Sequence, residues 1–571
     1  MKKGGIVSLW LATAVSITLI FSSFYKNTST ETASRADTRP NILLVMADDM
    51  GFSDLGCYGG EINTPNMDYL AENGLRFTQF YNTSRCCPTR AALLTGLYNH
   101  QAGIGKMTDE ESTPGYRGHL TENTVTIAEV LKAAGYQTGM TGKWHVSNTI
   151  VQKNPKDQLA WLNHKKDFGD FAPLAQYPTN RGFDRYFGNI WGVVDFFDPF
   201  SLVNGITPVT QVPENYYHTD AVSDTTVAYI KSFAKSSAPF FLYVAHTAPH
   251  WPLMALPEDI EKYKDTYKSG WEAIRKARYE KMIRLGLIDP KKTPLSERWN
   301  NDQTWEANPD KEWDAQAMAV HAAMIDRMDQ GIGRILNALR ETGQLENTLI
   351  LFLSDNGASP ENCAAYGPGF DRPNETRDGR PIVYDLKKTV MPGPQTSFAS
   401  IGQRWANVAN TPYQYWKAEA SEGGIHTPMI AFWPKGVKAK KGSFSAQVGH
   451  VMDFMRTCTE VAGAQYPKSF QGHTITPTTG HSLVPAFQGK TDRGHTTLFN
   501  EHFGARYARS GDWKLVTTGR DSTWHLFNLA NDKTETNELT EKYPEKVSEL
   551  KKLWHQWATT HQVLPKPPAK R

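Results

Sequence analysis

The chain has 571 residues, of which 39% are hydrophobic and 21% charged, and its 62 Lys and Arg against 59 Asp and Glu leave a net charge of +3. This composition is globular, because a disordered chain would contain fewer apolar residues. A charge balance so close to neutral, without a basic stripe, argues against a nucleic-acid-binding protein. We expect one large domain and a smaller one, because large α/β enzymes exceed the usual length of about 150 residues per domain.

The N-terminus has the pattern of a secretory leader. Lys2 and Lys3 precede an apolar run from Ile6 to Phe24, and a polar stretch from Lys26 to Arg39 follows. We interpret residues 1–37 as a signal peptide or, since the apolar run is nearly long enough to span a bilayer, as an uncleaved N-terminal anchor. Either interpretation predicts export, to the periplasm or to the outside of the cell.

Buried strands and helices alternate from residue 40 onward. Three continuous apolar runs are typical of strands buried on both faces, at 41–46, 240–245 and 348–354. Helical patterns that end near a Gly lie at 66–74, 126–135 and 320–339. This order predicts an α/β fold with a large, mostly parallel sheet sandwiched by helices.

Two long segments have the composition of surface insertions. Asp259 to Lys311 is dense in Lys, Arg, Glu and Trp, and Ser359 to Gly402 is rich in Pro, Gly and Asn. Loops of this length in a compact enzyme are usually lids or binding walls. We therefore expect both segments to shape a substrate pocket.

The pattern changes from about Gly489. Short strand-like runs separated by turn residues follow, and Tyr543 to Thr560 is an amphipathic helix. We expect a smaller antiparallel sheet packed by this terminal helix. The predicted organisation is a leader over residues 1–37, a large α/β domain over 38–488 and a C-terminal α+β subdomain over 489–571.

Polar pairs follow two of the predicted strands. Asp48 and Asp49 come after the first strand, and Asp355 and Asn356 come after the third. Ligands of open α/β sheets bind at the carboxyl ends of the strands, and hard oxygen ligands suit Ca²⁺ or Mg²⁺ better than zinc. One pair alone is about as well explained by a helix cap beside a solvated acid, whereas two such strand ends favour a shared metal site.

Cys86 is predicted to lie at the start of a helix. Pro88 occupies the first turn, and an apolar run follows from Ala91. A helix N-terminus stabilises negative charge, and Arg90 adds a fixed positive charge one turn away. For an isolated cysteine the alternative is a buried thiol beside an ordinary cap.

The string from Cys86 to Arg90, followed by Leu-Leu-Thr-Gly, resembles the signature of the sulfatase family, within the alkaline phosphatase-like superfamily. Thr89 stands where that signature usually has Ser and keeps the hydroxyl. Five further elements match the family in order along the chain. They are Asp48-Asp49, Thr141 to His145, Ala248 to Pro252, Asp355-Asn356, and Trp416-Lys417 with Glu422-Gly-Gly. The chain looks closest to bacterial arylsulfatases.

The resemblance implies a nucleophile and a metal site. In this family the signature cysteine, here Cys86, is oxidised to formylglycine, whose hydrate is a geminal diol that attacks sulfur. A divalent metal, Ca²⁺ rather than Mg²⁺, would be held by Asp48, Asp49, Asp355, Asn356 and the residue derived from Cys86. The resemblance also implies that Asp355 helps to deprotonate the diol.

The resemblance assigns the remaining polar residues to charge neutralisation and proton transfer. Arg90, Lys143 and Lys417 would neutralise the negative charge of a sulfate ester. His145 would assist the release of sulfate, and either His250 or Lys417 would protonate the leaving alcohol. The expected substrates are sulfated small molecules or sulfated polysaccharides, and the expected partner is a formylglycine-generating or an anaerobic maturation enzyme.

Two other functions remain open at this point. The same formylglycine site would serve a phosphonate or phosphate ester hydrolase. A non-catalytic, calcium-stabilised binding protein would result if Cys86 were never oxidised. A zinc-type alkaline phosphatase fits less well, because the chain offers Cys86 rather than Ser or Thr and few histidines near the strand ends.

Overall fold

The computed structural model describes residues 38–297, 303–519 and 522–567. The predicted leader, residues 1–37, therefore lies outside the described residues. The chain divides into Met1–Thr38 and Arg39–Arg571, and every helix and strand described below belongs to the second part. Within the described residues, no helix has the length and apolar content that crossing a membrane requires.

A large sheet forms the centre of this part of the chain. Among the described residues ten strands pair in the order β11-β2-β10-β9-β1-β8-β4-β5-β6-β7. The inner strands β9, β1, β8, β4 and β5 run parallel, and β10, β6 and β7 are antiparallel to their neighbours. The predicted mostly parallel sheet is confirmed. The strands are β1 (Asn41–Ala47), β2 (Leu75–Phe77), β4 (Gln137–Gly142), β5 (Arg185–Asn189), β6 (Leu202–Asn204), β7 (Thr207–Pro208), β8 (Phe240–Ala245), β9 (Thr348–Ser354), β10 (Met429–Phe432) and β11 (Ser443–Ser445).

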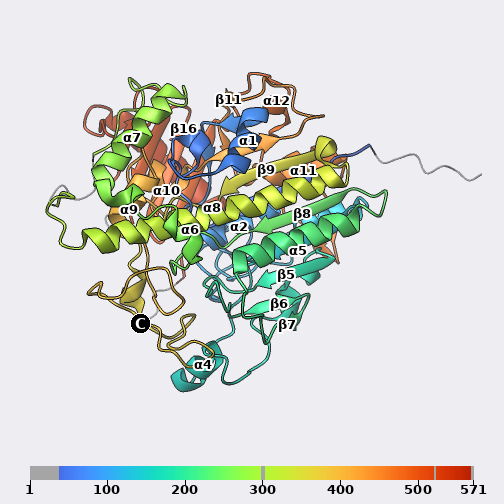
Figure 1. Cartoon of the computed structure of the whole chain (residues 1–571). Coiled ribbons are helices and arrows are strands. Elements are labelled where there is room, and N and C mark those ends of the chain that lie inside the picture. The colour runs from blue at the N-terminus through green and yellow to red at the C-terminus, as the bar shows by residue number, and fades with distance from the viewer. Residues whose placement is uncertain (1–37, 298–302, 520–521, 568–571) are drawn as a thin grey trace, which may run out of the picture. The chain divides into compact units, whose positions relative to one another are not determined.

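Helices cover both faces of the sheet, which explains why its central strands are continuously apolar. Leu43 and Val45 of β1 face α1, α5 and α8, whereas Ile42, Leu44 and Met46 face α2, α3 and α11. In Figure 1, α5 and α8 lie side by side across the front of the sheet. The helices are α1 (Pro65–Asn73), α2 (Cys86–Thr95), α3 (Ile127–Ala133), α4 (Pro155–Leu162), α5 (His218–Phe233), α6 (Pro257–Glu261), α7 (Gly270–Arg284), α8 (Lys311–Glu341), α9 (Gly402–Ala409), α10 (Glu422–Ile425), α11 (Asp453–Ala462), α12 (Val484–Phe487) and α13 (Pro544–Thr560).

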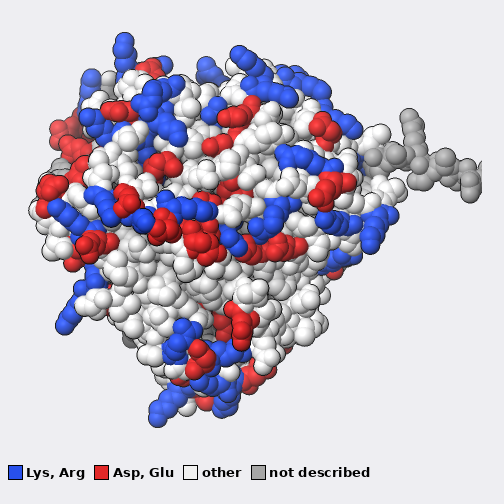
Figure 2. Space-filling view, in the orientation of Figure 1, with Lys and Arg blue, Asp and Glu red and all other residues white. Residues whose placement is uncertain are grey.

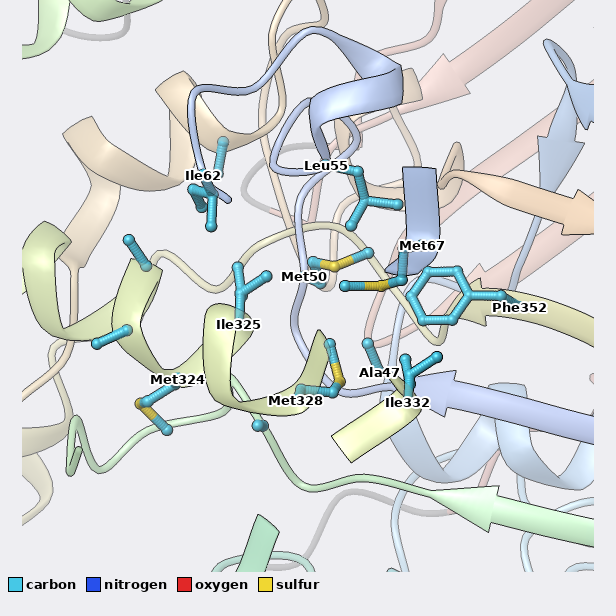
Figure 3. Packing of buried hydrophobic residues seen from close by; sticks show 14 of the residues in the cluster. Ala47, Met50, Leu55, Ile62, Met67, Met324, Ile325, Met328, Ile332 and Phe352 are labelled. Atoms are coloured by element: carbon cyan, nitrogen blue, oxygen red, sulfur yellow. The ribbon is translucent and has the colours of Figure 1, made fainter. Parts of the chain in front are cut away.

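The long helix α8 packs its apolar side on the middle of the sheet. Figure 3 shows Met328 and Ile332 of α8 close to Ala47 at the end of β1 and to Phe352 of β9. All four side chains are buried, so α8 holds the ends of these two strands in place. The polar loops that follow β1 and β9 therefore start from a rigid base.

The parallel strands end at one edge of the sheet. Because β1 pairs in parallel with β8 and β9, and β4 with β8, the loops after these four strands emerge together. These loops carry Asp48-Asp49, Lys143 to His145, His250 and Asp355-Asn356. The predicted meeting of two polar strand ends is confirmed.

The C-terminal segment forms a separate sheet that shares a core with the α/β part. Strands β15 (Thr497–His502), β16 (Ala505–Ser510), β17 (Trp513–Thr517) and β18 (His525–Asn528) are antiparallel, and α13 packs on them. The predicted antiparallel sheet with a terminal helix is confirmed. Leu498 and Trp554 of this segment lie in one apolar cluster with Tyr81 and Ile425 of the α/β part. The boundary at residue 488 stays a prediction. The described residues also form two pairs of short strands, β3 (Phe80–Tyr81) with β12 (Gly449–His450) and β13 (Ser469–Phe470) with β14 (His473–Thr474).

The segment 259–311 differs from the surface insertion that its composition suggested. It contains α7, whose Trp271 is buried against α9, and whose Arg278 is only 1% exposed in its side chain. Arg278 is buried because it pairs with Asp54 at 2.7 Å and with Glu61 at 2.7 Å. The sequence alone does not distinguish a charged residue that is paired and buried in the folded protein from one that is exposed at the surface.

The surface matches the neutral composition. On the face shown in Figure 2, positive and negative side chains intermingle along the exposed sides of α5, α6 and α8. Arg327 and Arg334 of α8 pair with Asp220 of α5, at 2.5 and 2.8 Å. This face is one of paired charges rather than of a single sign.

Candidate active site

Four of the five predicted metal ligands, the three aspartates and the asparagine, meet at the carboxyl edge of the sheet. Asp49 has a left-handed backbone with φ of 64°, which is uncommon for a residue with a side chain and marks a constrained turn. Its amide N donates to Asp355 Oδ1 at 3.2 Å, and Asn356 Nδ2 donates to Asp49 Oδ1 at 2.7 Å. Asp48 joins them because it shares Arg90 with Asp355. All of these ligands are buried.

Two oxygens of this group suit a hard cation. Asp48 Oδ1 and Asn356 Oδ1 are buried and have no hydrogen-bond partner among the described residues, although buried polar atoms are normally satisfied. Burial, and then the charge of Asp48, raises the pKa of Asp355 well above its ordinary range. Unpartnered oxygens and crowded carboxylates are what a bound Ca²⁺ or Mg²⁺ would relieve. The residues therefore fit a hard divalent metal.

Three cations surround the carboxylates. Lys143 Nζ lies 2.6 Å from Asp48 Oδ2, and Arg90 reaches Asp48 at 3.3 Å and Asp355 at 3.0 Å. Lys417 Nζ lies 2.9 Å from Asp49. Burial alone would raise the pKa of Asp48, but Lys143, His250 and Arg90 bring this pKa down to about 2. The carboxylate of Asp48 is thus kept ionised inside the protein.

Cys86 is the first residue of α2, as predicted, and its thiol lies in the same site. Its Sγ, that of Cys87 and a ring nitrogen of His145 all lie within 4.8 Å of one another. A hydrogen bond from Cys87, followed by the charges of Lys143 and His145, holds the pKa of Cys86 well below its ordinary value despite burial. Nearby positive charge and the start of a helix together favour a negative group at this position.

Backbone geometry aims His145 at Cys86. Gly142 ends β4 with φ of 90°, and His145 has φ of 54°. A Cβ on Gly192 would lie 2.4 Å from His145 Cε1, so only glycine leaves room for the ring. Burial lowers the pKa of His145, and its Nδ1 has no partner among the described residues. A neutral imidazole with an unused nitrogen can take or give a proton.

His250 and Lys417 form a pair on the other side of the site. His250 Nδ1 faces the carbonyl oxygen of Trp251, which leaves His250 Nε2 to face Lys417 Nζ at 3.3 Å. His250 Nε2 is also 3.5 Å from Asp49 Oδ2. Burial lowers the pKa of His250, whereas Asp49 and Glu361 raise that of Lys417 against the effect of burial. The proton of this pair is therefore held on Lys417.

All ten predicted site residues thus gather at one edge of the sheet. His246, four residues before His250 in the chain, lies apart from this site. Both of its ring nitrogens lack a partner among the described residues, and its electrostatic neighbours are His218, Arg334 and Asp220 rather than site residues. All five cysteines lie in the described part of the chain, where they are buried and free and form no disulfide.

The sequence did not single out two residues of the site, Glu361 and Arg85. Glu361, from the segment 359–402, lies 3.1 Å from Arg85 and 3.4 Å from Lys417. It also accepts a hydrogen bond from Trp251 Nε1 at 2.9 Å. The available signals were the place of Glu361 just after the second polar strand end and that of Arg85 just before Cys86. In a charged, irregular segment these signals do not single out one residue.

Comparisons with known proteins agree with this architecture. The sulfatase family profile matches residues 40–464, and a profile described as N-sulphoglucosamine sulphohydrolase, C-terminal, matches 414–562. An uncharacterised sulfatase of Schizosaccharomyces pombe is 31% identical over 90% of this chain and 93% of its own length. An arylsulfatase of Klebsiella aerogenes is 36% identical over 78% of this chain and 91% of its own length.

Solved structures share the fold. The crystal structure of Ps i-CgsB with k-i-k-neocarrahexaose is 23% identical, has a TM-score of 0.62, and covers 91% of this chain and 93% of its own. The sulfatase PsFucS1 of Pseudoalteromonas sp. is 20% identical, has a TM-score of 0.57, and covers 93% and 92%. The profile match over most of the chain and the two relatives extend well beyond the short motifs. The chain belongs to the sulfatase family and is a sulfuric ester hydrolase.

Proposed function

We propose that this chain cleaves sulfate monoesters. The nucleophile is a formylglycine hydrate made from Cys86, and the cofactor is a divalent metal, Ca²⁺ rather than Mg²⁺. The observation that carries the proposal is the burial of Cys86, at the start of α2, in one cluster with the carboxylates of Asp48 and Asp355 and the cations Lys143 and Arg90. These are the groups that hydrolysis of an anionic ester requires: a nucleophile, a metal site and fixed positive charge.

The metal ligands would be Asp48, Asp49, Asp355 and Asn356, together with the residue derived from Cys86. A bound Ca²⁺ supplies Lewis acidity for the ester oxygens and orients the nucleophile. The hydrate of formylglycine supplies one hydroxyl for attack on sulfur and a second whose loss of a proton releases the sulfate. The carboxylate of Asp355 would accept the proton of the attacking hydroxyl.

The chain's own residues then manage charge and protons. Lys143 and Arg90 are held by carboxylates, so they face the ester without reorganisation as its charge develops. His145 can accept a proton at its unused Nδ1. Because Lys417 carries a proton and donates toward His250 Nε2, the two can act as one donor to the leaving alcohol, with the charge held on Lys417 before transfer.

The substrate class is proposed from the chain's relatives. The Klebsiella aerogenes relative is named an arylsulfatase. Two structures of the same fold were solved with k-i-k-neocarrahexaose and with D-glucosamine-2-N,6-O-disulfate. We infer that this chain takes either aryl sulfates or sulfated saccharides.

Location and maturation belong to the same proposal. The leader-like segment 1–37 supports export to the periplasm or beyond. Cys86 is only 2% exposed, so an enzyme that oxidises it would have to act before the fold closes around α2. A formylglycine-generating or anaerobic maturation enzyme is therefore the partner we propose.

The proposal is tested with purified enzyme, co-expressed with a maturation enzyme and supplied with Ca²⁺. Nitrophenyl sulfate, nitrophenyl phosphate and a phosphonate ester are compared, with Cys86→Ala as the control. We expect sulfate release to dominate and to fall by about 10³-fold or more in the variant, because the whole nucleophile is removed. Preferential phosphate or phosphonate release would contradict the proposal. So would the absence of any turnover with Cys86 shown by peptide mass to be unoxidised.

A further inference from the structure

Glu361 places a negative charge on the outer side of the site's cations. Its carboxylate lies 3.1 Å from an Arg85 guanidinium nitrogen and 3.4 Å from Lys417 Nζ. Trp251 Nε1 and Ser359 Oγ donate to it, each at 2.9 Å. The Glu361 side chain is 11% exposed, so little solvent screens these contacts.

This carboxylate is not one of the group that fits a metal. The metal-fitting group is joined internally through Asp49, Asp355 and Asn356, whereas the partners of Glu361 are two cations and neutral hydrogen-bond donors. Lys417 links the two sets, since its Nζ also contacts Asp49 at 2.9 Å. Arg85 directly precedes Cys86 in the chain, so Glu361 offsets positive charge next to the reacting position.

Glu361 is ionised. Burial would raise its pKa, but Arg85 and Lys417 and the hydrogen bond from Trp251 together hold that pKa well below its ordinary range. With Glu361, the four cations Arg85, Arg90, Lys143 and Lys417 face four carboxylates in the buried site.

We propose that Glu361 determines the charge selectivity of the site, favouring monoanionic sulfate esters over dianionic phosphate esters. The inference rests on the proposed ester hydrolysis and extends it to substrate choice. A sulfate monoester carries one negative charge, whereas a phosphate monoester carries nearly two above its second pKa of about 6. A fixed carboxylate beside the binding cations repels the second charge, which is discrimination by an unfavourable contact.

The test is the ratio of kcat/KM for nitrophenyl sulfate to kcat/KM for nitrophenyl phosphate. In Glu361→Gln we expect this ratio to fall about tenfold or more, because a unit charge a few ångström away inside a protein is weakly screened. Arg85→Gln should raise the ratio, since it removes a cation instead of an anion. Glu361→Asp should keep the ratio near that of wild type, whatever its absolute rate.

The pH dependence separates charge from shape. The effect of Glu361→Gln on phosphate turnover, relative to wild type at the same pH, should be larger at pH 8 than at pH 5, because the ester gains its second charge near pH 6. Glu129→Gln is the matched control. Glu129 is a buried glutamate that pairs with Arg181 at 3.0 Å outside the site, and its loss should leave the ratio unchanged.

Binding provides a readout that does not need turnover. In the Cys86→Ala background, Glu361→Gln should lower the dissociation constant of phenyl phosphate more than that of phenyl sulfate. If both activities of Glu361→Gln fall together, with unchanged ratios of rates and of dissociation constants, Glu361 only supports the structure and the inference is wrong. If wild type hydrolyses no sulfate ester, the proposed function fails, and the ratio of dissociation constants still decides the role of Glu361.

Discussion

Single residues in this site are held by charge pairs that lie out of water. Asp48 is the clearest case, because Lys143 and Arg90 both approach its Oδ2, at 2.6 and 3.3 Å, while its Oδ1 has no partner among the described residues. Removing one member of a buried pair leaves the other charge uncompensated, which costs about 3–5 kcal/mol. One oxygen of Asp48 thus orders the cations, and the other is available to a metal.

The first prediction concerns Asp48→Asn. We expect hydrolysis of nitrophenyl sulfate to fall at least about 100-fold, because the lost carboxylate also orients Lys143 and Arg90. Wild type should show a rise in thermal midpoint on addition of Ca²⁺, and the variant should lose it. Asp184→Asn, which removes a half-exposed carboxylate paired with Lys132, should keep both properties. A Ca²⁺ response in Asp48→Asn equal to that of wild type would remove Asp48 from the ligand set.

At the scale of elements, strand ends and their turns decide where the side chains go. Strand β4 stops at Gly142, where the chain has φ of 90° and Lys143 N donates to Ala245 O at 2.8 Å. The turn then delivers Lys143 toward Asp48 and His145 toward Cys86. Only glycine suits this position, since it needs both the left-handed backbone and room beside β8.

Gly142→Ala tests this role of the turn. An added Cβ would lie 2.0 Å from Ala245 O, so β4 and β8 must separate. We expect a loss of stability of about 3 kcal/mol or more and a lower kcat, because two site residues follow directly. Gly205→Ala is the matched control, with φ of 65° and nothing within 4 Å of the new Cβ. It should cost about 1 kcal/mol and leave kcat unchanged. Equal losses in the two variants, measured by urea unfolding, would contradict this explanation.

At the scale of the whole molecule, buried ion pairs fasten the C-terminal sheet to the α/β part. Lys514 of β17 contacts Glu422 of α10 at 2.8 Å. Glu422 lies shortly after the site residue Lys417 in the chain. Glu501 of β15 contacts His100 at 3.3 Å and Lys566 at 2.5 Å. The second set joins the sheet, the loop after α2 and the end of the described chain, so the C-terminal sheet supports the surroundings of Cys86.

The stability of this junction should depend on pH through Glu501. Burial alone would raise the pKa of Glu501, but His100 and Lys566 lower this pKa from 4.5 to about 2. A carboxylate with a lowered pKa stabilises the fold above its unfolded pKa, and this stability is lost as pH falls from about 4.5 toward 2. The contribution at neutral pH is about 3 kcal/mol, since each pKa unit is worth about 1.4 kcal/mol.

The measurement compares thermal midpoints of wild type and Glu501→Gln between pH 7 and pH 3. The midpoint of the variant should be lower at pH 7, and the difference should shrink as the pH falls below 4.5. Glu346→Gln, a change at an acidic residue without a resolved ion pair among the described residues, serves as the comparison and should show no such convergence. A difference that stays constant with pH would mean that Glu501 acts through packing rather than through its charge.

The outcome differs among the sequence-based predictions for physical reasons. The strands at 41–46, 240–245 and 348–354 were predicted correctly because a strand buried on both faces must be apolar throughout. The helix α7 was not predicted, because its charged residues resemble a surface and Arg278 becomes buried only through Asp54 and Glu61.

The sequence by itself determined the central strands, the helix that begins at Cys86, and the ten polar residues to be sought at the strand ends, because these follow from local patterns and short motifs. Only the tertiary structure decided which groups touch. Lys417 and Asp49, 368 residues apart, form an ion pair, and Glu361 lies between Arg85 and Lys417. Such contacts depend on how distant segments pack, and burial sets the strength of each charge pair. No local pattern in a single sequence encodes the packing of distant segments or the burial of a charge pair.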